Sequence, residues 1–255
     1  MQARVERRND YDLYPTSDGK PMAETEVHRV QMNDLIFSLQ TLLADELRVY
    51  VGGNMMMYYT PGNGREHVSA DVFATFDVER GIRERWMTWE EGGRFADVVF
   101  EISSPSTIKE DLGKKMRLYA RLGVGEYYLY DPQRNNRPPL AGYRLVDGQY
   151  EPITRLVGVE GYRSEALGTE LRVIGPWLRI IDPATGVPVP IPAELAAARD
   201  EAEAARHAAE ERAITEVSAR KEIERAKQDS DAALRQALEE VARLRQVLEQ
   251  RGGGN

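Results

Sequence analysis

Residues 96–132 contain a strand, a helix and a second strand in succession, and this segment constrains the fold most strongly. Its sequence is ADVVFEISSPSTIKEDLGKKMRLYARLGVGEYYLYDP. The run Val98–Ile102 is apolar apart from Glu101, and a second strand-like run covers Glu126–Tyr130. Between them, helix-forming residues extend from about Glu110 to Leu122. This order of elements is typical of an α/β core.

A glutamate in the middle of an apolar strand needs a partner. Burying its charge without one costs on the order of several kcal/mol. Because side chains alternate along a strand, Glu101 shares a face with Asp97 and Ser103, whereas Phe100 points to the other side. A metal ion or a lysine could stabilise Glu101 there.

The helix offers such a lysine. Asp111, Lys115 and Tyr119 are spaced four residues apart, which places them on one helix face. Four cations surround Lys115 in sequence, so a solvated lysine on a charged helix is the alternative interpretation. Tyr119, in turn, also suits plain packing against the sheet.

The remainder of the first 191 residues predicts further elements of a mixed sheet flanked by helices. An amphipathic stripe predicts a helix over Glu26–Glu46. Apolar runs separated by Gly and Pro predict strands, over residues 47–51, 55–60, 68–76, 142–146, 170–173 and 177–181. The charged and aromatic segment 80–94 is expected to be an exposed excursion.

A second acid, Asp71, interrupts the apolar run of residues 68–76. Hydrolysis of a phosphodiester requires carboxylates that hold a metal ion, together with a cation that stabilises charge on the phosphate. Asp71, Glu101 and Lys115 could supply these groups. Asp97 lies four residues from Glu101, roughly 13 Å away at about 3.3 Å per residue, so the two cannot bind one ion on a regular strand. We therefore pair Asp71 with Glu101 and give Asp97 a supporting role.

These residues resemble the PD-(D/E)XK nuclease superfamily and, within it, the Uma-type (Uma-two) restriction endonuclease family. The matching text comprises Ala70-Asp71, Ala96-Asp97, Glu101 to Thr107, Asp111/Lys115/Tyr119, and Gly123 to Pro132. The resemblance covers roughly residues 24–183. It implies a restriction-endonuclease-like fold and hydrolysis of DNA with Mg²⁺, for which Mn²⁺ could substitute.

Carried over residue by residue, the resemblance makes Asp71 and Glu101 the metal ligands. This sequence has Ala70 and Ala96 where the family has proline. Ser103 occupies the position at which the general superfamily motif has lysine, so the resemblance assigns that lysine to Lys115 on the helix. The family's first helix often carries an acid and a histidine, matched here by Glu24 or Glu26 and by His28. A lone helix histidine is otherwise usually a surface residue.

Composition excludes some chemistry. Cysteine is absent, so no thiolate site or disulfide is possible. The formal net charge of −8 argues against a general nucleic-acid coat protein but is compatible with an acidic metal site. We find no apolar run long enough to span a bilayer and no signal-like apolar segment, and therefore expect a cytoplasmic protein with no membrane partner.

Residues 192–255 form a separate segment, rich in Ala, Glu, Arg and Gln, that predicts a long helix. Leu234, Leu238, Val241 and Leu248 follow a coiled-coil spacing that Arg245 interrupts. A homodimer is expected, since a duplex calls for two sites related by a two-fold axis. The alternatives are a catalytically silent nuclease-like module for binding nucleic acid or protein, assembled through this helix, and a structural adaptor.

Overall fold

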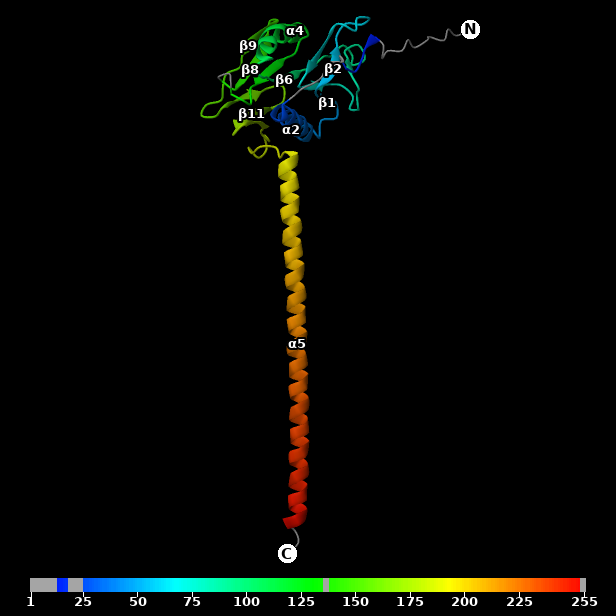
Figure 1. Cartoon of the computed structure of the whole chain (residues 1–255), viewed down its shortest axis with the longest axis vertical. Coiled ribbons are helices and arrows are strands. Elements are labelled where there is room, and N and C mark those ends of the chain that lie inside the picture. Colours follow the sequence, from blue (N-terminus) through cyan, green and yellow to red (C-terminus); the bar gives the residue numbers. More distant parts are fainter. Residues whose placement is uncertain (1–12, 18–24, 135–137, 253–255) are drawn as a thin grey trace, which may run out of the picture. The chain divides into compact units, whose positions relative to one another are not determined.

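The computed structural model describes residues 13–17, 25–134 and 138–252, with side chains to residue 246. The chain divides into two units, residues 1–192 and 193–255 (Figure 1). The first unit holds all the described strands, and the second is a single helix.

A six-stranded mixed sheet forms the centre of the first unit. Its strands are, in spatial order, β1 (Val49–Gly52), β4 (Val72–Phe76), β6 (Val98–Ile102), β7 (Glu126–Tyr130), β8 (Leu140–Val146) and β9 (Gln149–Pro152). Only the β6–β7 pair is parallel, with Val98 opposite Glu126, and the other neighbours are antiparallel. Parallel strands need a crossover connection, which here is the helical segment after β6. The mixed α/β class predicted from the sequence is confirmed.

Helix α2 (Glu26–Leu42) and a three-stranded sheet cover one face. This smaller sheet comprises β10 (Gly161–Ser164), β11 (Thr169–Ile174) and β12 (Trp177–Ile180). Leu35 and Leu39 of α2 pack with Phe100 of β6 in one core cluster. The buried amide of Gln31 bonds to both the N–H and the carbonyl of Leu178, at 2.8 and 3.0 Å. These two bonds fix α2 against β12.

The opposite face of the central sheet carries a second core cluster. Another small sheet lies there, in the order β3 (His67–Ala70), β2 (Met55–Tyr58) and β5 (Trp86–Met87). Val99 belongs to this cluster, whereas Phe100 belongs to the first, as the alternation along β6 predicts. Figure 1 shows α4 and α2 on opposite sides of β6.

The expected single strand over residues 68–76 is wrong, because the chain breaks at Asp71. Strands β3 and β4 flank this residue and belong to different sheets. The carboxylate of Asp71 bonds to a backbone N–H of β6 instead of facing a continuing ladder. Gly53 packs so closely that a Cβ there would lie 2.0 Å from the Asp71 carbonyl oxygen. The break thus turns Asp71 towards the end of β6.

The expected exposed excursion over residues 80–94 is wrong at its centre. Trp86 is fully buried in β5. Arg83 forms a largely buried ion pair with Glu91 at 2.5 Å, and its guanidinium lies over the rings of Tyr50 and Trp86. Two of the charges that suggested a solvated loop, Arg83 and Glu91, therefore pair with each other, and Arg83 lies over aromatic rings.

The helix expected over residues 110–122 consists of three pieces. They are α3 (Ile108–Glu110), the π-helical segment η1 (Asp111–Lys115) and α4 (Met116–Arg121). In η1 the N–H of Met116 bonds to the carbonyl of Asp111, five residues earlier, which is the π pattern. Such single π turns inside helices occur often at functional sites.

The second unit is the helix α5 (Pro192–Gly252) of 61 residues. Leu234, Leu238 and Val241 are exposed on it, and the side chain of Leu248 lies outside the described residues. Across the described residues, no helix is both long enough and apolar enough to span a membrane.

Candidate active site

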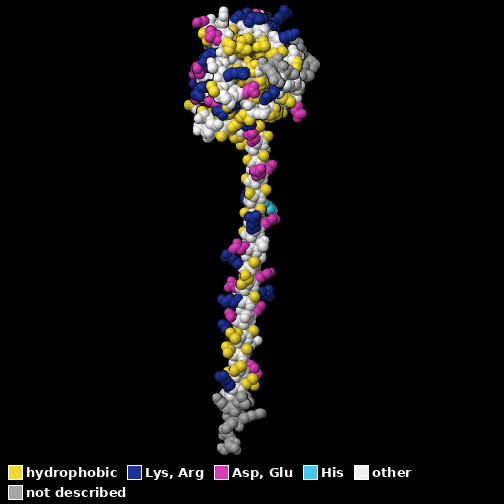
Figure 2. All heavy atoms as spheres, turned by 90° about the vertical axis from the view of Figure 1, so that its left-hand side faces the viewer, with side chains coloured by type: hydrophobic (Ala, Val, Ile, Leu, Met, Phe, Trp, Pro, Cys, Tyr) yellow, Lys and Arg dark blue, Asp and Glu magenta, His cyan; other side chains and the backbone are white. Residues whose placement is uncertain are grey.

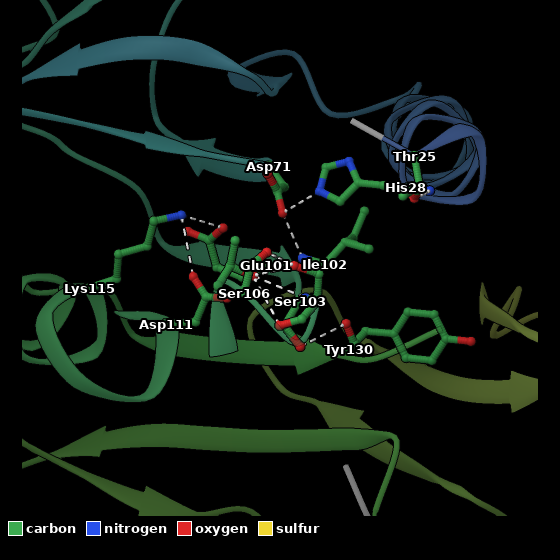
Figure 3. Close-up of polar contacts among 12 residues, drawn as sticks. Thr25, His28, Asp71, Glu101, Ile102, Ser103, Ser106, Asp111, Lys115 and Tyr130 are labelled. Carbon is green, nitrogen blue, oxygen red and sulfur yellow. Dashed lines mark hydrogen bonds and ion pairs between the residues drawn. The ribbon is translucent and has the colours of Figure 1, made fainter. Parts of the chain in front are cut away.

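Most of the predicted polar residues converge on one cavity of about 400 Å³ (Figure 3). Its walls come from the start of α2, the break between β3 and β4, the end of β6, the following loop, and η1. Figure 3 shows Asp71 between α2 and β6, with Lys115 reaching in from the helical crossover.

Glu101 is the most deeply buried acid of the site, with 1% of its surface exposed. Lys115 Nζ lies 2.8 Å from Oε2, and the hydroxyl of Tyr119 donates to Oε1 at 2.6 Å. The pKa of Glu101 is raised to about 8, mainly by burial. The negative charges of Asp71 and Asp111 also raise it, and attraction to Lys115 only partly offsets these effects. Burial therefore makes this carboxyl harder to ionise than an exposed glutamate.

Asp71 joins α2 to the end of β6. Its Oδ2 accepts a 2.7 Å hydrogen bond from the Ile102 N–H and lies 3.1 Å from His28 Nε2. Desolvation opposes its ionisation, but His28, Lys115 and the Ile102 N–H outweigh that effect and lower its pKa. Asp71 is thus the acid that carries charge most readily. Thr25 caps α2 by accepting from the His28 N–H, which starts the helix where His28 can reach the cavity.

The π segment η1 supplies the third carboxylate and the cation. Lys115 Nζ lies 3.5 Å from Asp111 Oδ1, and Asp111 is buried. Burial raises the pKa of Asp111. Burial alone would lower the pKa of Lys115, but Glu101, Asp71 and Asp111 together raise it. Lys115 is therefore a permanent cation held between acids, and the interpretation as a solvated lysine is wrong.

The structure brings together six of the predicted residues and leaves others apart. Asp71 pairs with His28, and beside this pair Glu101, Lys115, Asp111 and Tyr119 form a second hydrogen-bonded and ion-paired group. Ser103 also lines the cavity, with its hydroxyl 3.5 Å from the Tyr130 carbonyl.

Two acids lie elsewhere. Asp97 accepts a 2.7 Å hydrogen bond from the Phe76 N–H and stabilises the entry to β6, away from the cavity lining. Glu26 is exposed in the first turn of α2 and is not among the described residues that line the cavity. Glu24, its alternative, lies outside the described residues.

Sequence reasoning missed the polar rim of the cavity. Ser104, Ser106 and Thr107 follow β6 and line it, with the hydroxyl oxygens of Ser104 and Ser106 2.8 Å apart. Gln133 lines the same cavity from the turn after β7. The serines belong to the stretch that carries the family resemblance and could have been noted there, whereas Gln133 had no such signal.

The donor set suits a hard cation with few protein ligands. Within the described part of the chain, no group of three or more His, Cys, Asp or Glu side chains is arranged to hold a metal ion. Mg²⁺, however, usually binds through one or two carboxylates and keeps several waters. Asp71 and Glu101 line one cavity with room for such waters, so they fit this ion.

A family model, Uma2, described as "Putative restriction endonuclease", matches residues 5–173. The chain belongs to the Uma2 family. This confirms the resemblance drawn from the sequence, and Uma2 membership supports a nuclease function in general. No curated protein matches the chain.

Solved structures that match include one from Anabaena variabilis ATCC 29413, described as a "putative nuclease belonging to DUF820". It shares 13% sequence identity, and the match covers 60% of this chain and 82% of that chain with a TM-score of 0.42.

Proposed function

We propose that this Uma2 protein is a Mg²⁺-dependent endonuclease that hydrolyses phosphodiester bonds in DNA. The observation that carries the proposal is the convergence of Asp71, Glu101 and Lys115 in one open cavity. A purely structural Glu101–Lys115 pair would need neither the cavity beside it nor the second acid, Asp71. Family membership supports the same reaction class.

Each residue then has a chemical task. Asp71 and Glu101 hold the ion through carboxylate oxygens, and Mn²⁺ can take its place. A bound Mg²⁺ supplies Lewis-acid stabilisation of the phosphoryl oxygens and a coordinated water of lowered pKa. Lys115 stabilises negative charge on the phosphate or orients the attacking water.

The surrounding residues position these groups. His28 and the Ile102 N–H orient Asp71, and Tyr119 fixes the plane of the Glu101 carboxylate. With an ion bound, Glu101 would share its carboxylate between that ion and Lys115. Asp111 gives the ammonium a second carboxylate within 3.5 Å, so Lys115 can turn towards a phosphate without losing all its ion pairing.

DNA as the substrate draws support from the outer surface of the same crossover. Lys109, Lys114, Arg117 and Arg121 are exposed there and form no ion pair with any residue that the structure describes. Unpaired cations on an acidic protein are suited to a phosphate backbone. Because Lys115 belongs to the same segment, a strand bound to these cations would lie near the catalytic cavity.

The decisive experiment is nicking of supercoiled plasmid by purified protein over a Mg²⁺ or Mn²⁺ titration. We compare wild type, Glu101→Gln and Lys115→Met with the matched control Glu126→Gln. Glu126 is a buried acid of the adjacent strand, and its contacts to Tyr128, Ser164, Arg144 and the Glu165 N–H are structural. Metal-dependent nicking should vanish in the first two variants and persist in the control. Equal nicking by all four proteins would refute the assignment.

A second function, binding without catalysis, follows from the length and exposure of α5. A nuclease-like domain assembled through this helix could bind nucleic acid or protein as a homodimer. Binding would then be indifferent to Glu101→Gln, and divalent metal would leave the melting temperature of the wild type unchanged. Removal of residues 192–255 would abolish assembly while the first unit stays folded.

A further inference from the structure

Helix α5 spans 61 residues, and its described side chains are exposed along almost all of its length. Side chains from residue 193 to 246 are exposed apart from the partly buried Ala208. Apolar and oppositely charged side chains alternate along it (Figure 2). Most of the stability of a helix in a protein comes from packing of its apolar face, and these exposed side chains provide little such packing. A sustained periodicity over more than 25 residues is typical of a coiled coil.

One heptad phase runs through most of the helix. It starts with Leu195 at position a and Ala198 at position d, and repeats at intervals of three and four residues to Leu244. Most of these positions hold Ala, with the larger apolar residues Leu195, Ile223 and Leu244, which are 47%, 70% and 55% exposed. We call this line the heptad face. It differs from the Leu234–Leu238–Val241 seam, which covers only the last third of the helix.

The residues beside the heptad face are segregated by charge up to residue 229. The e positions, just after each d, carry the cations Arg199, Arg206, Arg220 and Lys227. The g positions, just before each a, carry the acids Glu201, Glu222 and Asp229. Residues at e and g set the partner and the orientation of a coiled coil. One flank of the face is thus basic and the other acidic.

This segregation selects one arrangement of two copies. In a parallel, in-register pair, each g residue meets the e residue five positions later on the partner helix. Glu201 then meets the partner's Arg206, and Glu222 meets the partner's Lys227, each twice by symmetry. An antiparallel pair would set e against e and g against g, so cations would face cations and acids would face acids.

Three charged residues interrupt the heptad face. Arg212, Glu216 and Glu240 occupy a or d positions, where the parallel pair sets each beside its own copy. Glu216 already pairs within the helix with Arg220, at 2.6 Å. Long charged side chains at the edge of a seam can extend into solvent. These positions weaken the association without reversing the orientation that the e and g residues favour.

We propose that α5 binds α5 of a second copy of this chain as a parallel, in-register two-stranded coiled coil through the heptad face. The partner's chemistry is that of α5 itself. Both copies of residue 192 then lie at the same end of the coiled coil, so both first units are attached at that end. The proposal is independent of the nuclease activity, since association can be measured without nucleic acid.

Single cysteines test the arrangement cleanly, because the natural sequence has none. Ala233 lies at a d position and Ala232, one residue earlier, at an outward c position. Under mild oxidation, full-length Ala233→Cys should convert mainly to a disulfide-linked dimer, whereas Ala232→Cys should stay largely monomeric on a denaturing gel. An antiparallel pair, or packing through the Leu234–Leu238–Val241 seam, would not bring together the two sulfurs introduced at position 233. Failure of Ala233→Cys to cross-link would therefore overturn the proposal.

Sedimentation equilibrium of the full chain, with helix content followed by circular dichroism, tests the charge pairs. Glu222→Lys should weaken dimerisation at least tenfold, and Lys227→Glu should do the same. The double variant should recover most of the wild-type affinity, while helix content stays similar throughout. A wild type that remains monomeric at tens of micromolar, or a double variant no better than the single ones, would contradict the proposal.

Discussion

The hydroxyl of Tyr119 lies 2.6 Å from Oε1 of Glu101, so the helix that follows β6 orients the one acid that β6 buries. Both residues are almost completely inaccessible. The contact links two positions 18 residues apart and closes the crossover onto the sheet. Lys115 occupies the other carboxylate oxygen, so the Glu101 side chain has no free rotation in the cavity.

Replacing Tyr119 with Phe removes the hydroxyl and leaves a buried carboxylate oxygen without its donor. An unsatisfied buried acceptor costs about 1–3 kcal/mol, so we expect a loss of that size in the free energy of unfolding by urea. Tyr128→Phe is the matched control, because the Tyr128 hydroxyl donates to the structural acid Glu126. Both variants should lose stability, but only Tyr119→Phe should also lower kcat for metal-dependent nicking. Equal kcat values in the two variants would limit Tyr119 to a structural role.

The pKa of Glu101 predicts how stability changes with pH. Folding raises this pKa from about 4.5 to about 8, mainly by burial, so the folded state binds more protons than the unfolded state between these values. The stabilisation relative to Glu101→Gln is therefore fully present below pH 4.5 and is lost as pH rises through 8. The slope is at most about 1.4 kcal/mol per pH unit. Without metal, the melting temperature of the wild type should fall relative to that of Glu101→Gln between pH 5 and 8.5. A constant or growing advantage of the wild type would contradict this sign.

Asp111 should matter through Lys115. Asp111→Asn removes one of the acids that raise the lysine pKa and hold its ammonium. We expect Lys115 to be positioned less well, and a barrier to hydrolysis raised by about 1.4 kcal/mol lowers nicking about tenfold. Glu110→Gln, one residue earlier and exposed, is the charge-matched control and should retain wild-type nicking. If the two variants nick equally well, Asp111 has no part in positioning Lys115.

The sequence predicted which polar residues come together better than it predicted the local structure around them. Glu101 stood out because an acid in an apolar strand needs a partner, and the four-residue spacing of Asp111, Lys115 and Tyr119 correctly placed them on one face. The π turn at Asp111 was not predictable. Helix propensity does not distinguish a hydrogen bond to the carbonyl five residues earlier from the usual bond to the carbonyl four residues earlier.

Long-range contacts explain the other differences. Periodicity alone joined residues 68–76 into one strand, whereas the bond from Asp71 to the Ile102 N–H, 31 residues away, divides them. Segment 80–94 was predicted to be exposed because its charges alternate in sign. The tertiary fold instead brings Arg83 to Glu91 above Tyr50, an arrangement that composition does not reveal.

The basic surface of the crossover predicts how DNA binding depends on salt. Changing Lys114, Arg117 and Arg121 together to Gln should weaken binding of a duplex oligonucleotide and flatten the plot of log affinity against log salt. The slope should fall by about 0.9 for each phosphate that the variant no longer neutralises. Fluorescence anisotropy in Ca²⁺, in place of Mg²⁺, measures binding while limiting cleavage.

The control for this prediction removes the same number of charges from α5. Lys221, Arg225 and Arg235 are exposed there and lie outside the heptad face, so changing all three to Gln leaves the proposed dimer intact. If net charge alone governed binding, both triple variants would weaken it equally. If the crossover binds the DNA backbone, only the first variant should lose affinity and salt dependence, since phosphates attract the cations that they touch far more than distant ones screened by salt.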